Sequence, residues 1–302
     1  MKSIEVAVIA AMLLAAPATA GAQASAPQTA RPAPQFYRAQ DGTELAYRYY
    51  PAIGGERQVA ILIHGSAGQS QGLHDLAQAL VAQGVSVYAP DIRGHGASGP
   101  RGDIAYIGQL EDDLEVLSGQ IRAAHPGKPV TLVGFSAGGA FGLRVAGGPH
   151  ASVADRYVIV SPALNDVARR GRGGWAKPDM PRIVLLMLLN KVGVHRFDGA
   201  EVIRFAVPQG RTDMTPAYSY RLMVNFAALD DKARMARVAA PMTLIAGAAD
   251  EQFDAAAYGP RLTPCNPQLK LRLLPGVRHY GMASDPRMIA GIAAQFSGET
   301  VS

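Results

Sequence analysis

One nine-residue stretch, 131–139 (TLVGFSAGG), constrains the fold of this chain more than any other. Its apolar first half is typical of a buried strand, and its second half predicts a sharp turn that leads directly into a helix. Glycines two places before and two places after Ser136 leave room where side chains would collide in such a turn. We therefore expect the Ser136 hydroxyl to stand clear of the sheet edge, beside the positive N-terminal end of the next helix.

Continuous apolar runs alternate with helical patterns along most of the chain. Such runs indicate strands buried on both faces, as in a parallel sheet covered by helices, and the alternation predicts right-handed crossovers. The expected strands are 59–63, 85–89, 129–133, 157–160, 241–247 and 269–274, and the expected helices are 73–82, 107–124 and 283–296. A hairpin over 36–50, with its turn at Asp41 and Gly42, precedes them.

The alternation is interrupted once. We therefore expect an α/β core over 36–162 and 241–298, with 163–240 inserted as a helical cap over the sheet edge; its clearest helices are 182–191 and 218–229. Within the cap, residues 183–189 (IVLLMLL) are apolar on every side but too short to span a membrane. They predict a core helix of the cap; the alternative is a helix that lines an apolar substrate tunnel.

The first 24 residues have the pattern of a secretory signal peptide. Lys2 supplies a positive start, an apolar run follows, and small residues precede cleavage points after Ala20 or Ala24. The alternative, an uncleaved membrane anchor, is disfavoured because the run is short for a bilayer. Residues 25–35 predict a disordered leader, and the protein is expected in the periplasm or the medium. Its single cysteine, Cys265, excludes an internal disulfide.

A serine hydroxyl needs a base to take its proton, and a carboxylate to orient that base. His279 lies in the loop after the last expected strand, where a sheet's carboxyl edge places ligand-facing residues, and it is the predicted base. Asp250 follows the strand before it and is the predicted acid. Asp166, beyond an earlier strand, is the alternative. Glu251 and Asp254 lie beside Asp250 but are assigned to the start of a helix.

The oxyanion of the reaction needs hydrogen-bond donors that are already in place. The first predicted donor is the backbone N–H of Ala137, immediately after the serine. The second is the N–H of Ser66, in the glycine-rich loop that follows the strand 59–63. Together with Ser136, Asp250 and His279, these amides complete a site for nucleophilic attack.

Composition argues against several other functions. The net charge is +5, and its one basic cluster, 169–172, matches no nucleic-acid motif and is interpreted as a solvated loop. The histidines and acids show no metal-binding spacing, so neither a metal nor a cofactor is expected. The histidines His64 and His95 follow strands in glycine-flanked loops, but both precede Ser136 in the chain.

Taken together, these motifs resemble the α/β-hydrolase family over 36–296, in which the chain order is nucleophile, acid, histidine. Within it, the chain looks most like the branch of monoacylglycerol lipases, lysophospholipases and serine-aminopeptidase-like hydrolases. The motifs that carry the resemblance are 63–66 (IHGS), 91–98 (DIRGHGAS), 134–139 (GFSAGG), 247–250 (GAAD) and 275–279 (PGVRH).

The resemblance implies the same triad, Ser136, Asp250 and His279, and the Ser66 and Ala137 amides as the oxyanion hole. It also implies a cap that covers an acyl pocket, and an Asp91 loop whose charges brace the turn at the serine.

The leading hypothesis is an exported serine hydrolase that cleaves carboxylic esters, lipid-like or small, through an acyl-enzyme. One alternative is a peptidase or amidase of the serine-aminopeptidase type, which would use the same residues. Another is a hydrolase-like protein that binds a ligand without turnover. The expected partner is a small ester with an apolar acyl group, with transient contact with a lipid surface and no nucleic acid.

Overall fold

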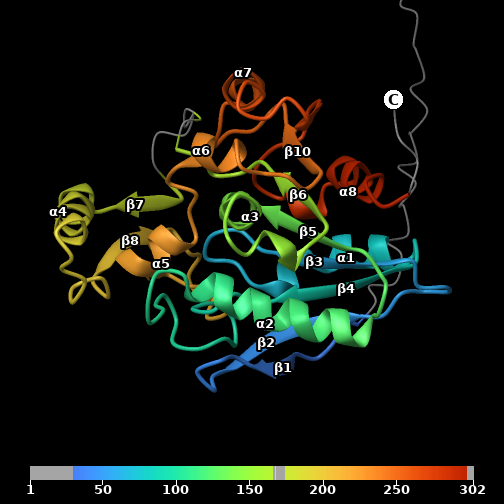
Figure 1. Cartoon of the computed structure of the whole chain (residues 1–302), viewed down its shortest axis with the longest axis horizontal. Coiled ribbons are helices and arrows are strands. Elements are labelled where there is room, and N and C mark those ends of the chain that lie inside the picture. Colours follow the sequence, from blue (N-terminus) through green and yellow to red (C-terminus); the bar gives the residue numbers. More distant parts are fainter. Residues whose placement is uncertain (1–29, 166, 168–173, 298–302) are drawn as a thin grey trace, which may run out of the picture. The chain divides into compact units, whose positions relative to one another are not determined.

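The computed structural model describes residues 30–165, 167 and 174–297. The expected signal peptide, residues 25–29 of the expected leader, Asp166 and the basic cluster 169–172 lie outside these residues. From residue 31 onward, the chain is one compact unit built on a central sheet. The structure confirms the α/β architecture expected from the sequence, with a mostly parallel sheet between two layers of helices (Figure 1).

The central sheet has eight strands in the order β1-β2-β4-β3-β5-β6-β10-β11. The hairpin β1–β2 forms one edge. The pairings of β1 with β2 and of β2 with β4 are antiparallel, whereas the other five pairings of this sheet are parallel. The strands are β1 (Gln35–Arg38), β2 (Glu44–Tyr50), β3 (Gln58–Ile63), β4 (Val85–Pro90), β5 (Val130–Phe135), β6 (Arg156–Val160), β10 (Met242–Gly247) and β11 (Lys270–Leu274). The serine stretch therefore ends β5, near the middle of the sheet.

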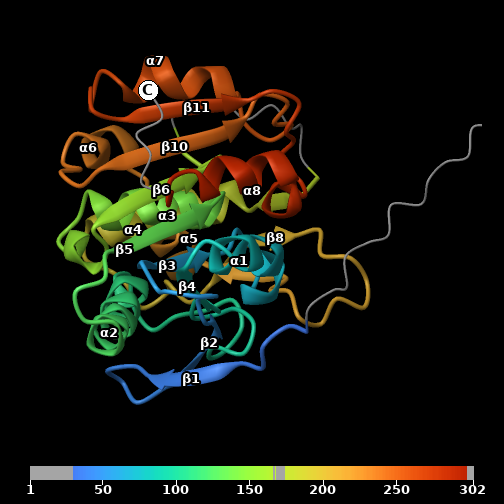
Figure 2. The same cartoon turned by 90° about the vertical axis from the view of Figure 1, so that its right-hand side faces the viewer.

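Helices cover both faces of the sheet, which explains why its inner strands are apolar on both sides. Figure 2 shows α2 (Gln109–Ala124) and α3 (Ala137–Ala146) on one face, and α1 (His74–Val81) and α8 (Pro286–Ala293) on the other. Each layer encloses a separate hydrophobic core. Every residue of β3, β4, β5 and β10 is buried, so neither face could lose its helices without exposing a wide apolar surface.

The segment between β6 and β10 contains helices, as expected, and also a three-stranded antiparallel sheet that was not expected. The strands have only three to five residues each, too few for an alternating pattern to be recognised in the sequence. In chain order the elements are β7 (Ala176–Pro178), α4 (Met180–Lys191), β8 (Glu201–Phe205), β9 (Ala217–Ser219), α5 (Tyr220–Asn225) and α6 (Asp231–Met235). We refer to this segment as the cap.

The apolar helix α4 differs from both expectations. It is not a core helix, because Leu186 is its only buried residue, and it lies at the outer end of the cap, at the left of Figure 1. It does not line a tunnel either, since none of its residues borders the cavity described below. One side of α4 packs on a small cluster with Val202 and Tyr220. The cap is too small to cover the remaining sides.

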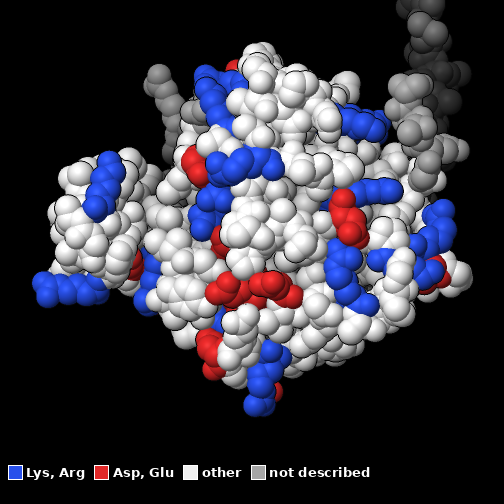
Figure 3. Space-filling model, viewed as in Figure 1, with Lys and Arg blue, Asp and Glu red and all other residues white. Residues whose placement is uncertain are grey.

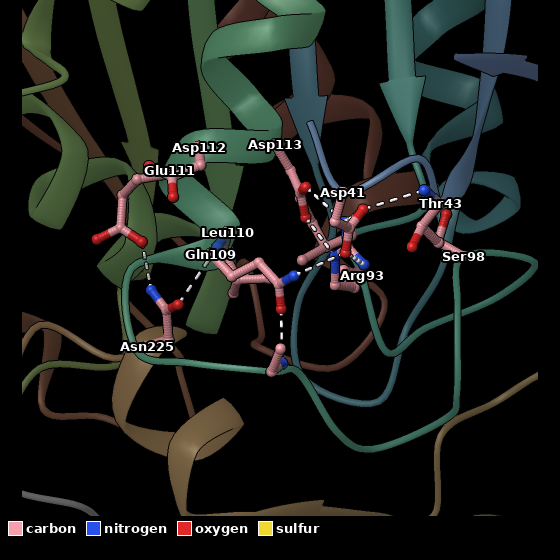
Figure 4. Close-up of polar contacts among 12 residues, drawn as sticks. Asp41, Thr43, Arg93, Ser98, Gln109, Leu110, Glu111, Asp112, Asp113 and Asn225 are labelled. Atoms are coloured by element: carbon pink, nitrogen blue, oxygen red, sulfur yellow. Dashed lines mark hydrogen bonds and ion pairs between the residues drawn. The ribbon is translucent and has the colours of Figure 1, made fainter. Parts of the chain in front are cut away.

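The inner part of the cap, by contrast, is fixed to the core by a buried amide (Figure 4). Asn225, at the end of α5, is fully buried. Its Oδ1 accepts hydrogen bonds from the N–H groups of Gly108 (2.8 Å) and Leu110 (3.3 Å) at the start of α2. Its Nδ2 donates to Glu111. The amide thereby satisfies helix N–H groups that have no partner within the helix.

No helix in the part of the chain that the structure describes is long and apolar enough to cross a membrane.

Candidate active site

Ser136 occupies a strained turn between β5 and α3. Its φ angle is +51°, a region that non-glycine residues rarely adopt. A Cβ atom on Gly134 would lie 2.1 Å from the Gly138 carbonyl oxygen, and one on Gly138 would lie 2.4 Å from the His64 carbonyl oxygen. Only glycine fits at either position. The turn therefore has the tight geometry predicted from the sequence, and it presents the serine at the carboxyl edge of the sheet.

His279 connects the serine to an acid. The His279 Nε2 atom lies 3.1 Å from Ser136 Oγ, and Nδ1 lies 2.9 Å from Asp250 Oδ2. Because a carboxylate can only accept, Nδ1 carries the proton and the Nε2 lone pair faces the serine hydroxyl. The three side chains come from the ends of β5, β10 and β11, and the structure brings them together as the sequence predicted.

Asp250 is ionised in this setting. Its side chain is completely buried, which by itself opposes ionisation. Its Oδ1 atom accepts hydrogen bonds from the backbone N–H groups of Gln252 (2.8 Å) and Phe253 (2.9 Å). Burial is outweighed by the hydrogen bond and charge of His279 and by these two N–H groups, so the pKa of Asp250 is lowered from its ordinary value. The carboxylate is thus available to orient the imidazole.

Glu251 has a role that the sequence did not indicate. It lies outside any helix, in the turn after β10, and its carboxylate accepts hydrogen bonds from the backbone N–H groups of His279 (2.8 Å) and Tyr280 (3.3 Å). Arg278 lies 3.3 Å from the same carboxylate. Glu251 therefore holds the backbone of the histidine loop, while Asp250 holds its side chain. In the sequence, the only sign of this role is that Glu251 directly follows Asp250.

The two predicted oxyanion donors lie on either side of Ser136. Ala137 is the first residue of α3, where the backbone N–H has no partner within the helix. Ser66 follows Gly65, and a Cβ atom on Gly65 would lie 3.3 Å from Ser136 Cβ, so this loop packs directly against the serine. Within the described part of the chain, the Ser66 N–H has no hydrogen-bond acceptor. Both amides are free to donate to a bound oxygen.

A cavity of about 790 Å³ opens over the serine and the histidine. The cap contributes large apolar side chains to its lining, and we refer to these as the apolar roof. Of the described residues that line it, Asp213 is the only acid, and this carboxylate already accepts hydrogen bonds from Arg211 and Gln69. The large apolar side chains that the cap contributes to the lining include Trp175, Ile203, Phe205, Met214, Met223 and Phe226.

Residues 54–283, about three quarters of the chain, match the profile of the serine aminopeptidase S33 family. The chain belongs to this family. Its relatives include a monoacylglycerol lipase of Mycolicibacterium smegmatis, 33% identical over 138 residues, and the human monoglyceride lipase, 30% identical over 125 residues. These matches cover 42% and 41% of the chain, and only 49% and 41% of the relatives. The chain thus matches about half the length of these relatives or less.

Solved structures show the same fold over nearly the whole length. A soluble variant of the Saccharomyces cerevisiae monoglyceride lipase, in complex with a substrate analogue, has a TM-score of 0.69 at 19% identity, covering 91% of this chain and 96% of that one. A carboxyl esterase of Bacillus coagulans, in complex with glycerol, has a TM-score of 0.66 at 16% identity, covering 89% and 99%. At such identities the likeness concerns the α/β-hydrolase fold alone.

The resemblance implied that the charges of the Asp91 loop brace the turn at Ser136, but in this S33 family member they contact other segments. Asp91 instead accepts hydrogen bonds from the N–H groups of Ser70 (2.8 Å) and Ala97 (3.0 Å). It therefore ties its own loop to the segment after the Ser66 loop. Arg93 points the other way, to Asp113 on α2 (2.7 Å) and Asp41 in the hairpin (2.9 Å), as Figure 4 shows.

The remaining candidates are not part of the triad. His64 and His95 are buried beside each other, with ring centroids 4.8 Å apart. The alternative acid, Asp166, lies outside the described residues. Among the residues that the structure does describe, no group of three or more histidine, cysteine or acidic side chains could hold a metal ion.

Proposed function

We propose that this protein is a serine hydrolase that cleaves carboxylic esters through an acyl-enzyme. The observation that carries the proposal is the continuous chain of contacts from Asp250 through His279 to Ser136, which opens into a mostly apolar cavity. Its membership of the S33 family supports hydrolysis as the chemistry. The lipase relatives support an ester as the substrate class.

In the first half of the reaction, Ser136 Oγ attacks the ester carbonyl carbon and passes its proton to His279 Nε2. The carbonyl oxygen becomes an oxyanion that accepts hydrogen bonds from the N–H groups of Ser66 and Ala137. The Asp250 carboxylate stabilises the imidazolium. When the tetrahedral intermediate collapses, the ester C–O bond breaks and the imidazolium gives its proton to the departing alcohol.

In the second half, His279 takes a proton from water, and the resulting hydroxide attacks the acyl carbon attached to Ser136 Oγ. The same two amides hold the second oxyanion. The bond from the acyl carbon to Ser136 Oγ then breaks, the serine recovers its proton from the imidazolium, and the carboxylic acid leaves. No group other than water is needed to balance the reaction.

The cavity favours an ester over the amino-terminal end of a peptide. An aminopeptidase must hold a free α-ammonium group, for which a carboxylate is the usual partner. The one acid among the described lining residues, Asp213, is already paired with Arg211 at 2.8 Å. The apolar roof, by comparison, matches an acyl chain.

A fluorophosphonate probe tests catalysis directly. We expect covalent labelling of the wild-type protein at Ser136 and none of Ser136→Ala. A panel of p-nitrophenyl esters of rising chain length, beside aminoacyl anilides, then separates esterase from peptidase. Preferential cleavage of anilides would refute the ester proposal, and a wild-type protein that is not labelled would instead indicate a ligand-binding protein without turnover.

We also propose transient contact with a lipid surface, through α4. The helix carries two cations, Arg182 and Lys191, and no acid, which suits an anionic surface. Figure 3 shows basic groups and little acidic surface on the lobe at the left, where Figure 1 places α4. The exposed apolar side chains on and just after the helix are Met180, Val184, Leu185, Met187, Leu188 and Val192.

Vesicle co-sedimentation tests this contact. Replacing both Leu185 and Leu188 by serine should reduce binding to vesicles that contain phosphatidylglycerol, without changing turnover of a short soluble ester. Ile53→Ser is the matched control, because it alters an exposed apolar side chain outside the cap. This variant should bind like the wild type. Equal binding by all three proteins would refute the proposal.

Export is a third proposal, supported by the N-terminal sequence alone. The mature protein from the periplasm or the medium should begin at Gly21 or Ser25. N-terminal sequencing of the expressed full chain checks this, and an intact start at Met1 or Lys2 would contradict it.

A further inference from the structure

The Ser66 N–H belongs to a peptide group whose carbonyl oxygen is held by hydrogen bonds. That group joins Gly65 to Ser66, and its Gly65 oxygen lies 2.8 Å from His64 Nδ1 and 3.1 Å from the Gly68 nitrogen. Because the peptide bond is planar and trans, its C=O and N–H point in opposite directions. Two donors on the oxygen therefore direct the Ser66 N–H away from His64.

The next residue, Ala67, is held by the cap through both its N–H and its C=O. The Ala67 N–H donates to the hydroxyl of Tyr218 (2.6 Å), and the Ala67 oxygen accepts from the N–H of Thr215 (3.1 Å). Ala67 is fully buried and has a φ angle of +59°, a conformation that is strained for a non-glycine residue. This strained backbone persists only because its surroundings hold it on both sides.

Ile92 connects the hydrogen bonds made by His64 with those made by His95 and Tyr218. The Ile92 N–H donates to His64 Nε2 (3.2 Å). The proton of His64 is therefore on Nδ1, from which it is donated to the Gly65 oxygen. The Ile92 oxygen lies 3.1 Å from His95 Nδ1, and His95 Nε2 lies 2.5 Å from the Tyr218 hydroxyl. Both imidazoles are therefore neutral with the proton on Nδ1, and Tyr218 donates to His95 while it accepts from Ala67.

Burial supports these protonation states. It lowers the pKa of both His64 and His95, and the neighbouring His64 lowers that of His95 further. Burial also raises the pKa of Tyr218, which keeps its hydroxyl proton.

We propose that Tyr218 is a positioning residue for the oxyanion hole: through its hydroxyl, the cap and His95 together hold the loop that presents the Ser66 amide. The inference rests on the proposed hydrolase function. It adds to it a cap residue that borders the cavity and acts through the Ala67 N–H rather than on the reacting atoms. It explains why a loop 151 residues away in the chain from Tyr218 is held so firmly. Removing the hydroxyl would loosen the oxyanion donor without disturbing the triad.

Tyr218→Phe tests the proposal. The phenyl ring keeps the packing against Phe205 and His95, whose centroids lie 4.6 and 5.1 Å from the Tyr218 ring, so only the hydroxyl is lost. Removing an oxyanion donor outright costs about 10²–10³ in kcat, so loosening one should cost about 10-fold. We expect kcat to fall by that factor with KM within about twofold of the wild-type value.

A tetrahedral inhibitor separates positioning from general destabilisation. A trifluoromethyl ketone that adds to Ser136 places an oxyanion in the hole, so its affinity should fall about 10-fold in Tyr218→Phe, in parallel with kcat. Tyr157→Phe is the matched control: Tyr157 is also buried and donates to a backbone oxygen, that of Ala151, at 2.8 Å. This control should lose stability but neither kcat nor inhibitor affinity.

A second variant protects the test against misfolding. His95→Asn removes the partner of the same hydroxyl. Because both substitutions act through one contact, kcat of the double variant should be no lower than that of the more impaired single variant. Tyr218→Phe with kcat and inhibitor affinity within twofold of wild type would overturn the inference. Failure of the proposed function would be seen separately, as a wild-type protein that fluorophosphonate does not label.

Discussion

The two sides of Ser136 are held in different ways. On the base side, Asp250 and Glu251 follow β10 and bind the side chain and the backbone of His279, so one core loop orients another. On the oxyanion side, a backbone amide is oriented by buried neutral side chains, and one of them, Tyr218, belongs to the cap. The base side is thus held by charged groups of the core, whereas the oxyanion side depends on burial and on a docked insertion.

The largest expected effect tests the base side. Asp250→Asn keeps the shape of the carboxylate but no longer favours the Nδ1–H form of His279, so kcat should fall about 10⁴-fold. Steady-state kinetics on a p-nitrophenyl ester measures the loss. Asp75→Asn, an exposed acid on α1, should stay within twofold of wild type. If Asp250→Asn kept a tenth of the activity, another group would have to orient the histidine.

This comparison also explains what could be predicted from the sequence. Ser136, Asp250 and His279 each lie in the turn or loop that follows a strand of the sheet, and the carboxyl ends of parallel strands meet at one edge. Their convergence follows from strand order alone. The same reasoning located the Ser66 loop, because it too follows a strand.

The support behind Ser66 could not be predicted in this way. His95 and Tyr218 are 123 residues apart in the chain, and their contact depends on how the cap docks. The cap's three-residue strands carry no periodic signal, and α4 has the composition of a buried helix although it is exposed. Glu251 was missed because its partners are backbone N–H groups, which are the same for any sequence.

The stability of the two sides should respond to pH over different ranges. His64 and His95 have folded-state pKa values below the ordinary 6.5, so below that pH the unfolded chain binds protons that the folded protein does not. Their contribution to stability is present above pH 6.5 and is lost as the pH falls towards their folded-state values. Asp250, whose pKa is lowered from 3.8, loses its contribution only at still lower pH.

Urea unfolding at pH 7 and pH 5.5 measures this difference. The free energy of unfolding should fall over that interval by up to about 2.5 kcal/mol, the limit reached when both histidines stay neutral in the folded state. His95→Asn should lose less than the wild type, whereas His195→Gln, at an exposed position, should follow the wild type. An unchanged wild-type stability at pH 5.5 would show that the imidazoles are protonated in place, and the hydrogen-bond assignment on the oxyanion side would be wrong.

Weakening the cap should affect the oxyanion side more than the base side. Asn225→Ala leaves two N–H groups of α2 and the Glu111 carboxylate without their buried partner, so the free energy of unfolding should fall by about 2 kcal/mol. Because Tyr218 lies just before α5, affinity for a trifluoromethyl ketone should fall as well. Asn190→Ala, which removes hydrogen bonds from the outer cap to Leu186 and Asp198, should leave that affinity unchanged. Equal losses in the two variants would mean that the whole cap, and not its inner part, supports the loop.

The smallest effect concerns Glu251, and it tests whether the base side is complete without a second acid. Glu251→Ala frees the backbone N–H groups of His279 and Tyr280 while the bond from Asp250 to the imidazole remains. Because the ring would keep its tautomer but lose some of its alignment with Ser136, kcat should fall about 10-fold with an unchanged KM.

Glu251→Gln is the matched variant, since its amide oxygen can still accept one of these two hydrogen bonds, and it should recover much of the loss. In Glu251→Ala, affinity for the trifluoromethyl ketone should fall less than kcat, because the N–H groups of Ser66 and Ala137 that bind its oxyanion are unchanged. If affinity and kcat fell together, the two sides would be coupled through the serine itself, and the separation between a charged base side and a buried oxyanion side would not hold.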